Sequence, residues 1–355
     1  MVQSKLSWRH LRDNKVFWPV VALALIMIFN VLFTPGFFNM EIKEGHLFGN
    51  LIDILNRGSA LMLLGIGMTM VIATGGVDVS VGAVIAISGA MACVLINPQL
   101  ATGLKQSEDL IKDFTYTPLP LLILAGLGVA TLCGLWNGIL VSRLNIQPLV
   151  ATLVLMVAGR GIAQLIVNGT ILTVYYSPYF FIGNGFLLGL PFTLFIVAAV
   201  YILAWLLTRK TAIGLFVEAV GINPRSSFVS GIDAKNIKLL AYTFCGFCAG
   251  IAGLILSSNV KSADANTVGL NFELDAILAV VIGGTLMSGG RFSLLASIVG
   301  ALVIQATTTT MYALGVPAMA ATAVKAMVVL IVILLYSEQV KSVLTTFFER
   351  KGARA

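Results

Sequence analysis

Apolar runs long enough to cross a lipid bilayer recur along nearly the whole chain, and they constrain its fold more than any other feature. A membrane-spanning helix needs about 20 mostly apolar residues. Only 10% of the residues are charged and 58% are hydrophobic, whereas soluble domains carry roughly 25% charged residues. We therefore predict an all-α membrane protein, because 355 residues hold about ten such spans and leave no room for a large soluble domain.

The apolar runs define ten expected transmembrane helices. The first run follows a basic segment and is too long for a cleaved signal peptide, so we expect it to remain as a span. The expected spans cover about residues 17–33, 58–73, 83–96, 119–141, 149–167, 191–208, 239–257, 275–288, 293–313 and 319–336. The segments around 42–57 and 258–274 are candidates for short re-entrant helices.

The distribution of charge gives the expected orientation. Ten spans with a cytoplasmic N-terminus also place the C-terminus in the cytoplasm, and cytoplasmic loops are the ones that carry an excess of Lys and Arg. The chain is then divided into a basic cytoplasmic N-terminus (1–16), a transmembrane domain (17–336) and a cytoplasmic tail (337–355). The net charge of +7 does not indicate nucleic-acid binding, because the basic residues lie in short loops and at the termini.

The longest polar segment, residues 209–238, is expected on the cytoplasmic side and is predicted to form a loop, a short helix and a second loop. Asn223 is a favourable N-cap, Pro224 suits the first helical position, and Gly231 suits the position after the end. An isolated helix of about two turns is only marginally stable in water, so we expect this helix to pack against another surface. It is either an ordinary loop helix or a docking helix that enters a groove on a partner protein.

A glycine-rich pattern occurs twice. Gly75-Gly76, followed by Ser80 and Gly82, recurs with the same spacing in residues 283–290. Glycine-rich interruptions in two halves of a transporter suggest broken helices beside a translocation pathway. The alternative is that these small residues only let helices pack closely.

Polar side chains inside spans are costly and therefore informative. Arg160 lies mid-span with Gln164 one turn later, and either Glu273 or Asp275 is its expected partner. Asp78 and Lys325, near span ends, are expected to reach the membrane surface or to pair. The candidate pathway residues are Asp78, Ser80, Asn137, Arg160, Gln164, Asp275 and Gln305. For any one of them, hydrogen bonding that only holds the bundle together is the alternative.

Several kinds of functional site are missing from the sequence. It contains no G-x-x-x-x-G-K-[ST] phosphate-binding loop for ATP, and its two histidines lie outside the expected spans. Cys245 and Cys248 lie within a span, where packing is the expected role rather than metal binding or redox chemistry. We therefore expect no enzyme, no metal and no cofactor bound by this chain.

Six motifs resemble the permease subunits of bacterial ABC importers of the ribose/galactose type. The motifs are Gly75-Gly-Val-Asp-Val-Ser-Val-Gly82, Trp136-Asn-Gly138, Ile146-Gln-Pro-Leu-Val-Ala-Thr-Leu153, Glu218-Ala-Val-Gly-Ile-Asn-Pro-Arg225, Ser230-Gly-Ile232 and Gly289-Gly-Arg-Phe292. Three further stretches, residues 154–166, 262–270 and 273–284, look most like the galactofuranose importer permeases. The resemblance covers about residues 47–336.

The resemblance implies the partners and the mechanism. It implies a bacterial inner-membrane permease that forms a homodimer or a heterodimer with a paralogue. Two cytoplasmic ATP-binding cassette subunits would bind ATP and magnesium, and a periplasmic sugar-binding protein would deliver a monosaccharide. The short helix matches the family's coupling helix, with expected ATPase contacts at Asn223, Arg225, Ser227 and Phe228 and with Glu218 expected to support the loop. An ion-coupled secondary transporter is the alternative, and the sugar is left open.

Overall fold

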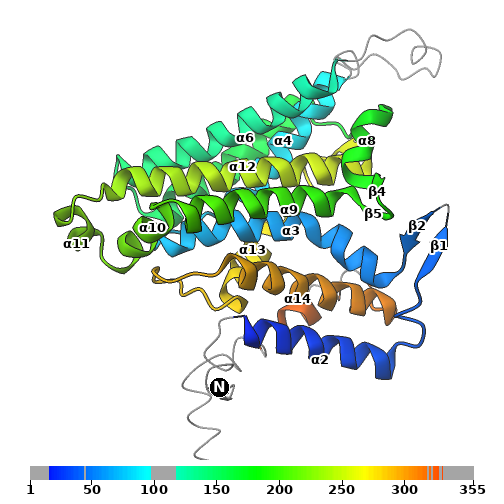
Figure 1. The fold of residues 1–355 in the computed structure, drawn as a ribbon. Coiled ribbons are helices and arrows are strands. Elements are labelled where there is room, and N and C mark those ends of the chain that lie inside the picture. Colours follow the sequence, from blue (N-terminus) through cyan, green and yellow to red (C-terminus); the bar gives the residue numbers. More distant parts are fainter. Residues whose placement is uncertain are drawn as a thin grey trace, which may run out of the picture.

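The computed structural model describes residues 16–43, 45–96, 117–317, 320, 323–327 and 330. Its helices run side by side as a bundle (Figure 1). Six of the described helical segments are long and apolar enough to cross a bilayer. They are α3 (Asn50–Ala73), α6 (Leu119–Ser142), α7 (Pro148–Ile166), α9 (Phe192–Trp205) with the π-helix η2 (Leu206–Lys210), α12 (Ala234–Val260) and α14 (Leu294–Ala313).

Three apolar helices of the bundle are shorter. They are α2 (Phe17–Phe33), α4 (Val81–Ile96) and α13 (Phe272–Ile282). The eighth expected span is therefore corrected, because α13 begins three residues earlier and ends before the second glycine-rich segment. The expectation of a mostly helical multi-pass chain is confirmed. The number ten stays a prediction, since the tenth expected span, 319–336, falls largely outside the described residues.

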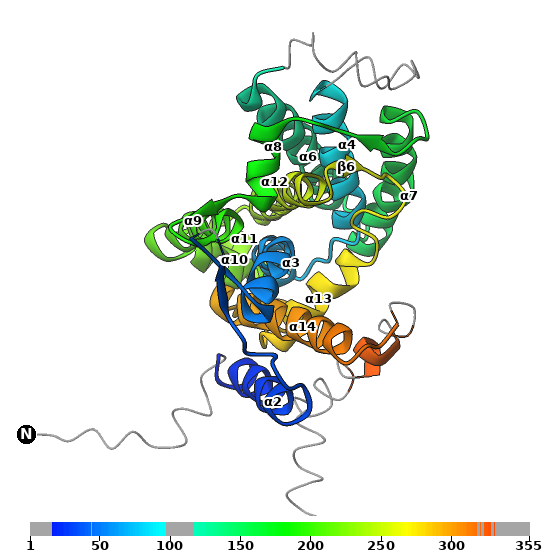
Figure 2. The same cartoon turned by 90° about the vertical axis from the view of Figure 1, so that its right-hand side faces the viewer.

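The helix α12 lies at the centre of the bundle, where it packs against α3, α4 and α6 (Figure 2). Glycine makes the closest of these contacts possible. A Cβ atom on Gly134 of α6 would lie 2.5 Å from the carbonyl oxygen of Tyr242, and one on Gly246 of α12 would lie 2.6 Å from that of Ala130. Both contacts are to backbone, so the two helix axes could not stay this close with larger residues.

The other helices cover this centre. The helix α7 packs on α4, α9 packs on α3, and α14 packs on α2, α3 and α13. Cys245 and Cys248 are buried and free, and they face Gly67 of α3, in agreement with the packing role expected from the sequence.

One end of the bundle carries short strands, a departure from the expected all-α fold. The hairpin of β1 (Glu41–Lys43) and β2 (His46–Phe48) lies there with α8 (Ser177–Asn184) and the pair β4 (Phe186–Leu187) and β5 (Leu190–Pro191) (Figure 1). His46 stacks on Phe186, with ring centroids 4.5 Å apart. A third pair joins β3 (Leu172–Thr173) to β6 (Ser262–Ala263). The segment 42–57 is therefore a hairpin and the start of α3, not a separate re-entrant helix.

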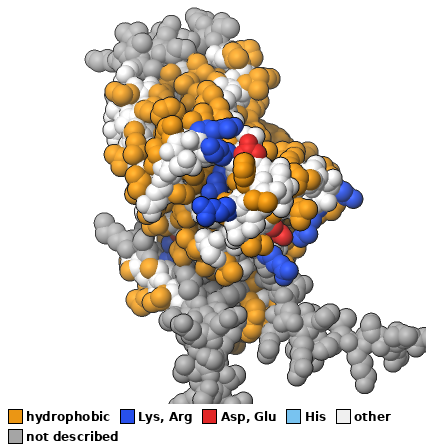
Figure 3. Space-filling view, turned by 90° about the vertical axis from the view of Figure 1, so that its left-hand side faces the viewer, with side chains coloured by type: hydrophobic (Ala, Val, Ile, Leu, Met, Phe, Trp, Pro, Cys, Tyr) orange, Lys and Arg blue, Asp and Glu red, His pale blue; other side chains and the backbone are white. Residues whose placement is uncertain are grey.

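The opposite end carries two helices outside the bundle proper, α10 (Ile213–Ile222) and α11 (Pro224–Val229). The expected loop before the short helix is thus wrong over residues 213–222, because an apolar run in this polar segment forms α10 and packs on the bundle. Lys and Arg side chains gather on this end (Figure 3). The basic residues in the segments at this end of the bundle are Arg143, Arg209, Lys210, Arg225, Lys235, Lys238 and Arg291.

Candidate functional site

The short helix α11 is stabilised by its own polar residues, as the sequence predicted. The Asn223 side-chain oxygen accepts hydrogen bonds from the backbone N–H groups of Arg225 (3.0 Å) and Ser226 (3.1 Å). The Ser227 hydroxyl donates to the Asn223 carbonyl oxygen at 2.9 Å and is buried. Gly231 ends the segment with φ +82°, a left-handed conformation that favours glycine.

The helix α11 exposes large apolar side chains at the basic end of the molecule. Phe228 is 72% exposed and Val229 is 85% exposed. Leaving these side chains in water forgoes about 1.5–3 kcal/mol each. Arg225 is exposed beside them, whereas Glu218 lies half-buried on α10. Exposed apolar residues on a preformed helix are typical of a helix that enters a groove on a partner.

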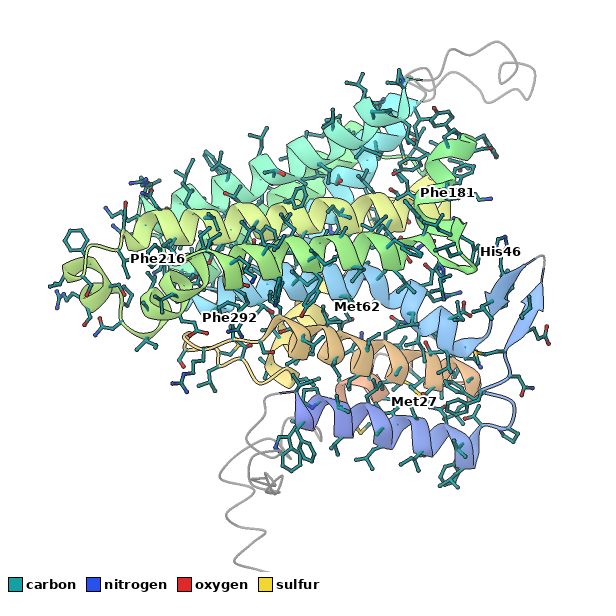
Figure 4. The ribbon with its side chains drawn as sticks, viewed as in Figure 1. Met27, His46, Met62, Phe181, Phe216 and Phe292 are labelled. Atoms are coloured by element: carbon teal, nitrogen blue, oxygen red, sulfur yellow. The ribbon has the colours of Figure 1, made fainter. Side chains whose placement is uncertain are left out.

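The neighbouring helix α10 meets the bundle through a glycine. A Cβ atom on Gly221 would lie 1.9 Å from the carbonyl oxygen of Ala73 and 2.4 Å from the backbone nitrogen of Gly290. Ala73 is the last residue of α3, and Gly290 lies between α13 and α14. The Gly290 N–H donates to the Ala73 carbonyl at 2.9 Å. In Figure 4, Phe216 of α10 and Phe292 of the segment after α13 lie at this same end.

The two glycine-rich segments predicted from the repeated pattern lie against each other at this contact. A Cβ atom on Gly289 would lie 2.9 Å from the Gly75 nitrogen and 2.9 Å from the Gly221 carbonyl oxygen. Gly75 has φ +77° and Gly289 has φ +90°, so both need the freedom of glycine. We name Gly75, Gly221, Gly289 and Gly290 the glycine contact. It joins α10 to two non-helical segments, one before α4 and one after α13, which we call the two breaks.

The short helices α4 and α13 begin at one place inside the bundle and run to opposite ends (Figure 1). A Cβ atom on Gly82, in the first turn of α4, would lie 2.2 Å from Oε2 of Glu273, in the first turn of α13. One on Gly159, within α7, would lie 3.0 Å from Cβ of Ala83. Two half-length helices whose N-termini meet inside a bundle are a recurring arrangement at substrate sites of membrane transporters.

Asp78, Ser80 and Asn137 form one buried cluster before α4. Asp78 accepts hydrogen bonds from the Ser80 N–H (2.9 Å) and hydroxyl (2.6 Å) and from the Asn137 amide (3.4 Å). The Asn137 amide also donates to the Ser80 hydroxyl at 2.8 Å. Asp78 is 1% exposed, so the expectation that it reaches the membrane surface is wrong, and its partners among the described residues are hydrogen-bond donors rather than a cation. Local hydrogen bonds hold Asp78 in the non-helical segment between α3 and α4.

Arg160 and Gln164 hold the non-helical segment that precedes α13. In the described part of the chain Arg160 forms no ion pair with Glu273 or Asp275, the partners suggested by the sequence. Its guanidinium donates instead to the carbonyl oxygens of Ala265 (3.2 Å) and Val268, and Gln164 donates to the Asn266 side chain at 2.6 Å. Within a membrane every backbone polar group needs a partner, and Arg160 supplies two.

The remaining candidates lie apart from these clusters. Asp275 forms an ion pair with Lys325 at 2.7 Å, so of the two alternatives expected for Lys325, reaching the membrane surface or pairing, the structure shows pairing. Gln305 of α14 donates to the Thr309 hydroxyl at 3.4 Å. The seven candidates therefore do not form one site. The described residues contain no group of three or more His, Cys, Asp or Glu side chains that could hold a metal ion.

The sequence did not indicate the roles of four residues of this region. The Tyr242 hydroxyl donates to the Val77 carbonyl at 3.1 Å, and the Thr152 hydroxyl accepts from the Val79 N–H at 3.3 Å, so α12 and α7 support the break before α4. Glu273, suggested only as a partner for Arg160, is 4% exposed, and its Oε2 has no hydrogen-bond partner in the described structure. Gly221 occurred in a quoted motif, but nothing in its sequence context indicated its contact.

Comparison with known proteins agrees with this geometry. Residues 50–336 match the family model described as the branched-chain amino acid transport system / permease component. The galactofuranose transporter permease protein YtfT of Escherichia coli (strain K12) is 48% identical over 343 residues, which cover 95% of this chain and 94% of the relative. The fructose import permease protein FruF of Bifidobacterium longum (strain NCC 2705) is 36% identical, over 98% of this chain and 94% of the relative.

The ribose import permease protein RbsC of Haemophilus influenzae (strain ATCC 51907 / DSM 11121 / KW20 / Rd) is 32% identical, over 88% of this chain and 90% of the relative. No solved structure matches the chain. The resemblance read from the sequence is therefore confirmed, as is the expectation of a transporter subunit rather than an enzyme. The chain belongs to the permease-component family of ABC importers and is a multi-pass membrane subunit.

Proposed function

We propose that this chain is one of two permease subunits of an ATP-driven importer that moves a monosaccharide across the bacterial inner membrane. Galactofuranose is the first candidate substrate, because the relative with 48% identity is a galactofuranose transporter permease. Ribose and fructose follow, since permeases for these sugars are 32% and 36% identical to the chain. The observation that carries the ATP-driven mechanism is the capped helix α11, which exposes Phe228 and Val229 at the basic end of the bundle.

The basic end faces the cytoplasm in this proposal, according to the positive-inside rule. Residues 17–336 form the permease domain with ten spans, and residues 209–238 form its cytoplasmic coupling segment. The described part of the first helix, α2, begins at the same end as α11 (Figure 1), which supports a cytoplasmic N-terminal segment 1–16. The tail 337–355 falls outside the described residues, and this proposal assigns it to the cytoplasm as well.

The coupling surface combines contact residues with supporting residues. Phe228 enters a groove of the ATP-binding cassette subunit, and Arg225 meets an acidic group beside that groove. Asn223 and Ser227 keep α11 formed through the hydrogen bonds described above. Glu218 orients α10. ATP and magnesium bind to the partner subunit, since the sequence contains no phosphate-binding loop.

Movement of α11 reaches the bundle through the glycine contact. Because α10 touches both the end of α3 and the segment before α14, displacement of α10 acts on the two breaks together. The half-length helices α4 and α13 then shift between outward-facing and inward-facing arrangements. ATP binding and hydrolysis in the partner supply the free energy for this exchange.

The substrate pathway runs along the α7 side of α13. Gln164 and Asn266 are exposed there and Arg160 is half-buried, and polar groups exposed at membrane depth face water or protein rather than lipid. A second permease subunit, identical or paralogous, completes the pathway opposite them. Amide and guanidinium donors suit a hydroxyl-rich sugar. Asp78, Ser80, Asn137, Asp275 and Gln305 support this path by holding its walls.

Transport by the reconstituted complex tests the proposal. The permease is placed in proteoliposomes with its ATP-binding subunit and its periplasmic sugar-binding protein, and uptake of labelled galactofuranose, ribose and fructose is measured. We expect ATP-dependent uptake that is insensitive to a protonophore. Uptake that needs no ATP and stops on addition of the protonophore would instead support the ion-coupled carrier.

A further inference from the structure

A groove on the outside of the bundle, near its basic end, is lined by α6, α12 and the π-helix η2. It has a volume of about 450 Å³. The apolar side chains that line it are Leu135, Leu207, Leu239, Leu240, Phe244 and Phe247. All six are half-buried, so their exposed parts form the groove walls. The groove lies apart from the α7 side of the molecule, where the pathway residues are found.

The length of the groove along α12 is similar to the thickness of one membrane leaflet. Its lining on α12 extends from Asn236 to Phe247, about 16 Å along a helix that rises 1.5 Å per residue. Half of the hydrocarbon core of a bilayer is about 15 Å thick. A groove of this length that starts at the basic end of α12 would reach about the middle of a bilayer, which suits one acyl chain from that leaflet.

Basic residues follow or precede the lining residues closely in the chain at the open end of the groove. On one side, Arg209 and Lys210 come directly after Leu207 and Thr208, and Lys210 Nζ lies 5.6 Å from the centroid of the Trp205 ring. On the other side, Arg143 donates to the Asn236 side chain, and Lys235 lies one turn before Leu239. Figure 3 shows Lys and Arg side chains gathered on this end.

These basic groups are not neutralised within the described structure. No ion pair of Arg143, Arg209, Lys210 or Lys235 occurs there; the nearby Asp233 carboxylate accepts a hydrogen bond from the Lys235 backbone N–H instead. An apolar groove with Arg143 bound to its lining residue Asn236, and three more cations close by in the chain, matches a phosphodiester headgroup with attached acyl chains. Basic pockets between transmembrane helices on the cytoplasmic side are known to bind anionic lipid headgroups.

We propose that the groove between α6, α12 and η2 binds one anionic phospholipid of the inner leaflet, with an acyl chain along Leu240 and Phe244 and the phosphate near Arg209 and Lys210. The bound lipid would fix η2, from which α10 follows after two residues. The lipid site therefore stands beside the coupling segment.

Native mass spectrometry of the purified transporter tests the site, with phosphatidylglycerol and phosphatidylethanolamine of equal chain length as probes. We expect one phosphatidylglycerol per permease chain, bound at least tenfold more tightly than phosphatidylethanolamine. The double variant Arg209→Gln/Lys210→Gln should lose at least tenfold in affinity for phosphatidylglycerol. Arg209 and Lys210 are both exposed, so we expect this variant to fold.

Lys261→Gln is the matched control, because Lys261 also lies over an aromatic ring, 4.9 Å from the Phe180 centroid, but on a different loop. Its affinity should equal that of the unsubstituted protein. A second variant, Leu240→Trp, fills the groove without a change of charge and should also remove the bound lipid. Equal affinities for the two lipids, or unchanged binding by both groove variants, would overturn the proposal.

Discussion

The substitution Gly221→Ala tests whether the glycine contact transmits motion from the coupling segment. The new Cβ atom would lie 1.9 Å from the Ala73 oxygen and 2.4 Å from the Gly290 nitrogen, whereas real Cβ contacts are essentially never under 3.0 Å. Both neighbours are backbone atoms, so no side chain can rotate away. The helix α10 must therefore move by about 1 Å or more.

The size of the effect follows from this displacement. Overpacking of a close contact costs typically 1–3 kcal/mol, which can be met by moving α10 away from the two glycine-rich segments. If the contact carries the coupling, a free energy of about 1–3 kcal/mol corresponds to a 5- to 150-fold change. We therefore expect the number of sugar molecules imported per ATP hydrolysed to decrease about 5- to 150-fold. The helix α11 should still bind the ATPase subunit.

The assay compares uptake and ATP hydrolysis in the same proteoliposomes. Gly128→Ala is the matched control, because Gly128 is also a helical glycine, but a Cβ atom added to it would meet nothing within 4 Å. This control should retain the ratio of the unsubstituted complex. If Gly221→Ala retained the same ratio as Gly128→Ala, the transmission of motion through the glycine contact would be refuted.

Three further substitutions test separate parts of the account. Asn223→Ala removes the cap of α11 and should destabilise that helix by about 0.5–2 kcal/mol; faster amide hydrogen exchange in residues 224–230 would show it, and unchanged exchange would contradict it. Arg160→Met leaves the Ala265 carbonyl without its donor and should abolish uptake while ATPase binding persists; full uptake would exclude a role in the pathway. Asn137→Leu removes donors from the buried Asp78 cluster and should lower the free energy of unfolding by about 1–3 kcal/mol, measured as a lower Tm in detergent, against an unchanged Tm if the cluster contributes nothing.

The parts of the fold that sequence predicted well are those with local signals. The cap and end of α11 depend on Asn223, Pro224 and Gly231, which are neighbours in the chain, and the structure confirms the cap hydrogen bonds. The repeated glycine pattern indicated two breaks, because glycine in a span weakens the helix and permits close backbone approach. Span positions followed from the lengths of the apolar runs.

The parts that sequence did not predict depend on tertiary contacts. Arg160 has backbone carbonyls as acceptors, and a backbone carbonyl has no sequence signature, so carboxylates were expected in its place. The helix α10 was predicted as loop because it lies within a polar segment, although its apolar residues pack on the bundle. The role of Gly221 depends on Ala73 and Gly290, which are distant in the chain.

The most direct test of the account is affinity purification of the Phe228→Asp variant in mild detergent, followed by quantification of the ATP-binding subunit. Phe228 is 72% exposed, and Ile42, on the strand β1 at the opposite end, is 75% exposed; Ile42→Asp is therefore the control. We predict that the unsubstituted permease and Ile42→Asp retain the ATP-binding subunit in stoichiometric amount, whereas Phe228→Asp loses it and remains in the membrane. Retention of a coupled ATPase by Phe228→Asp would contradict the assignment of α11 as the coupling helix.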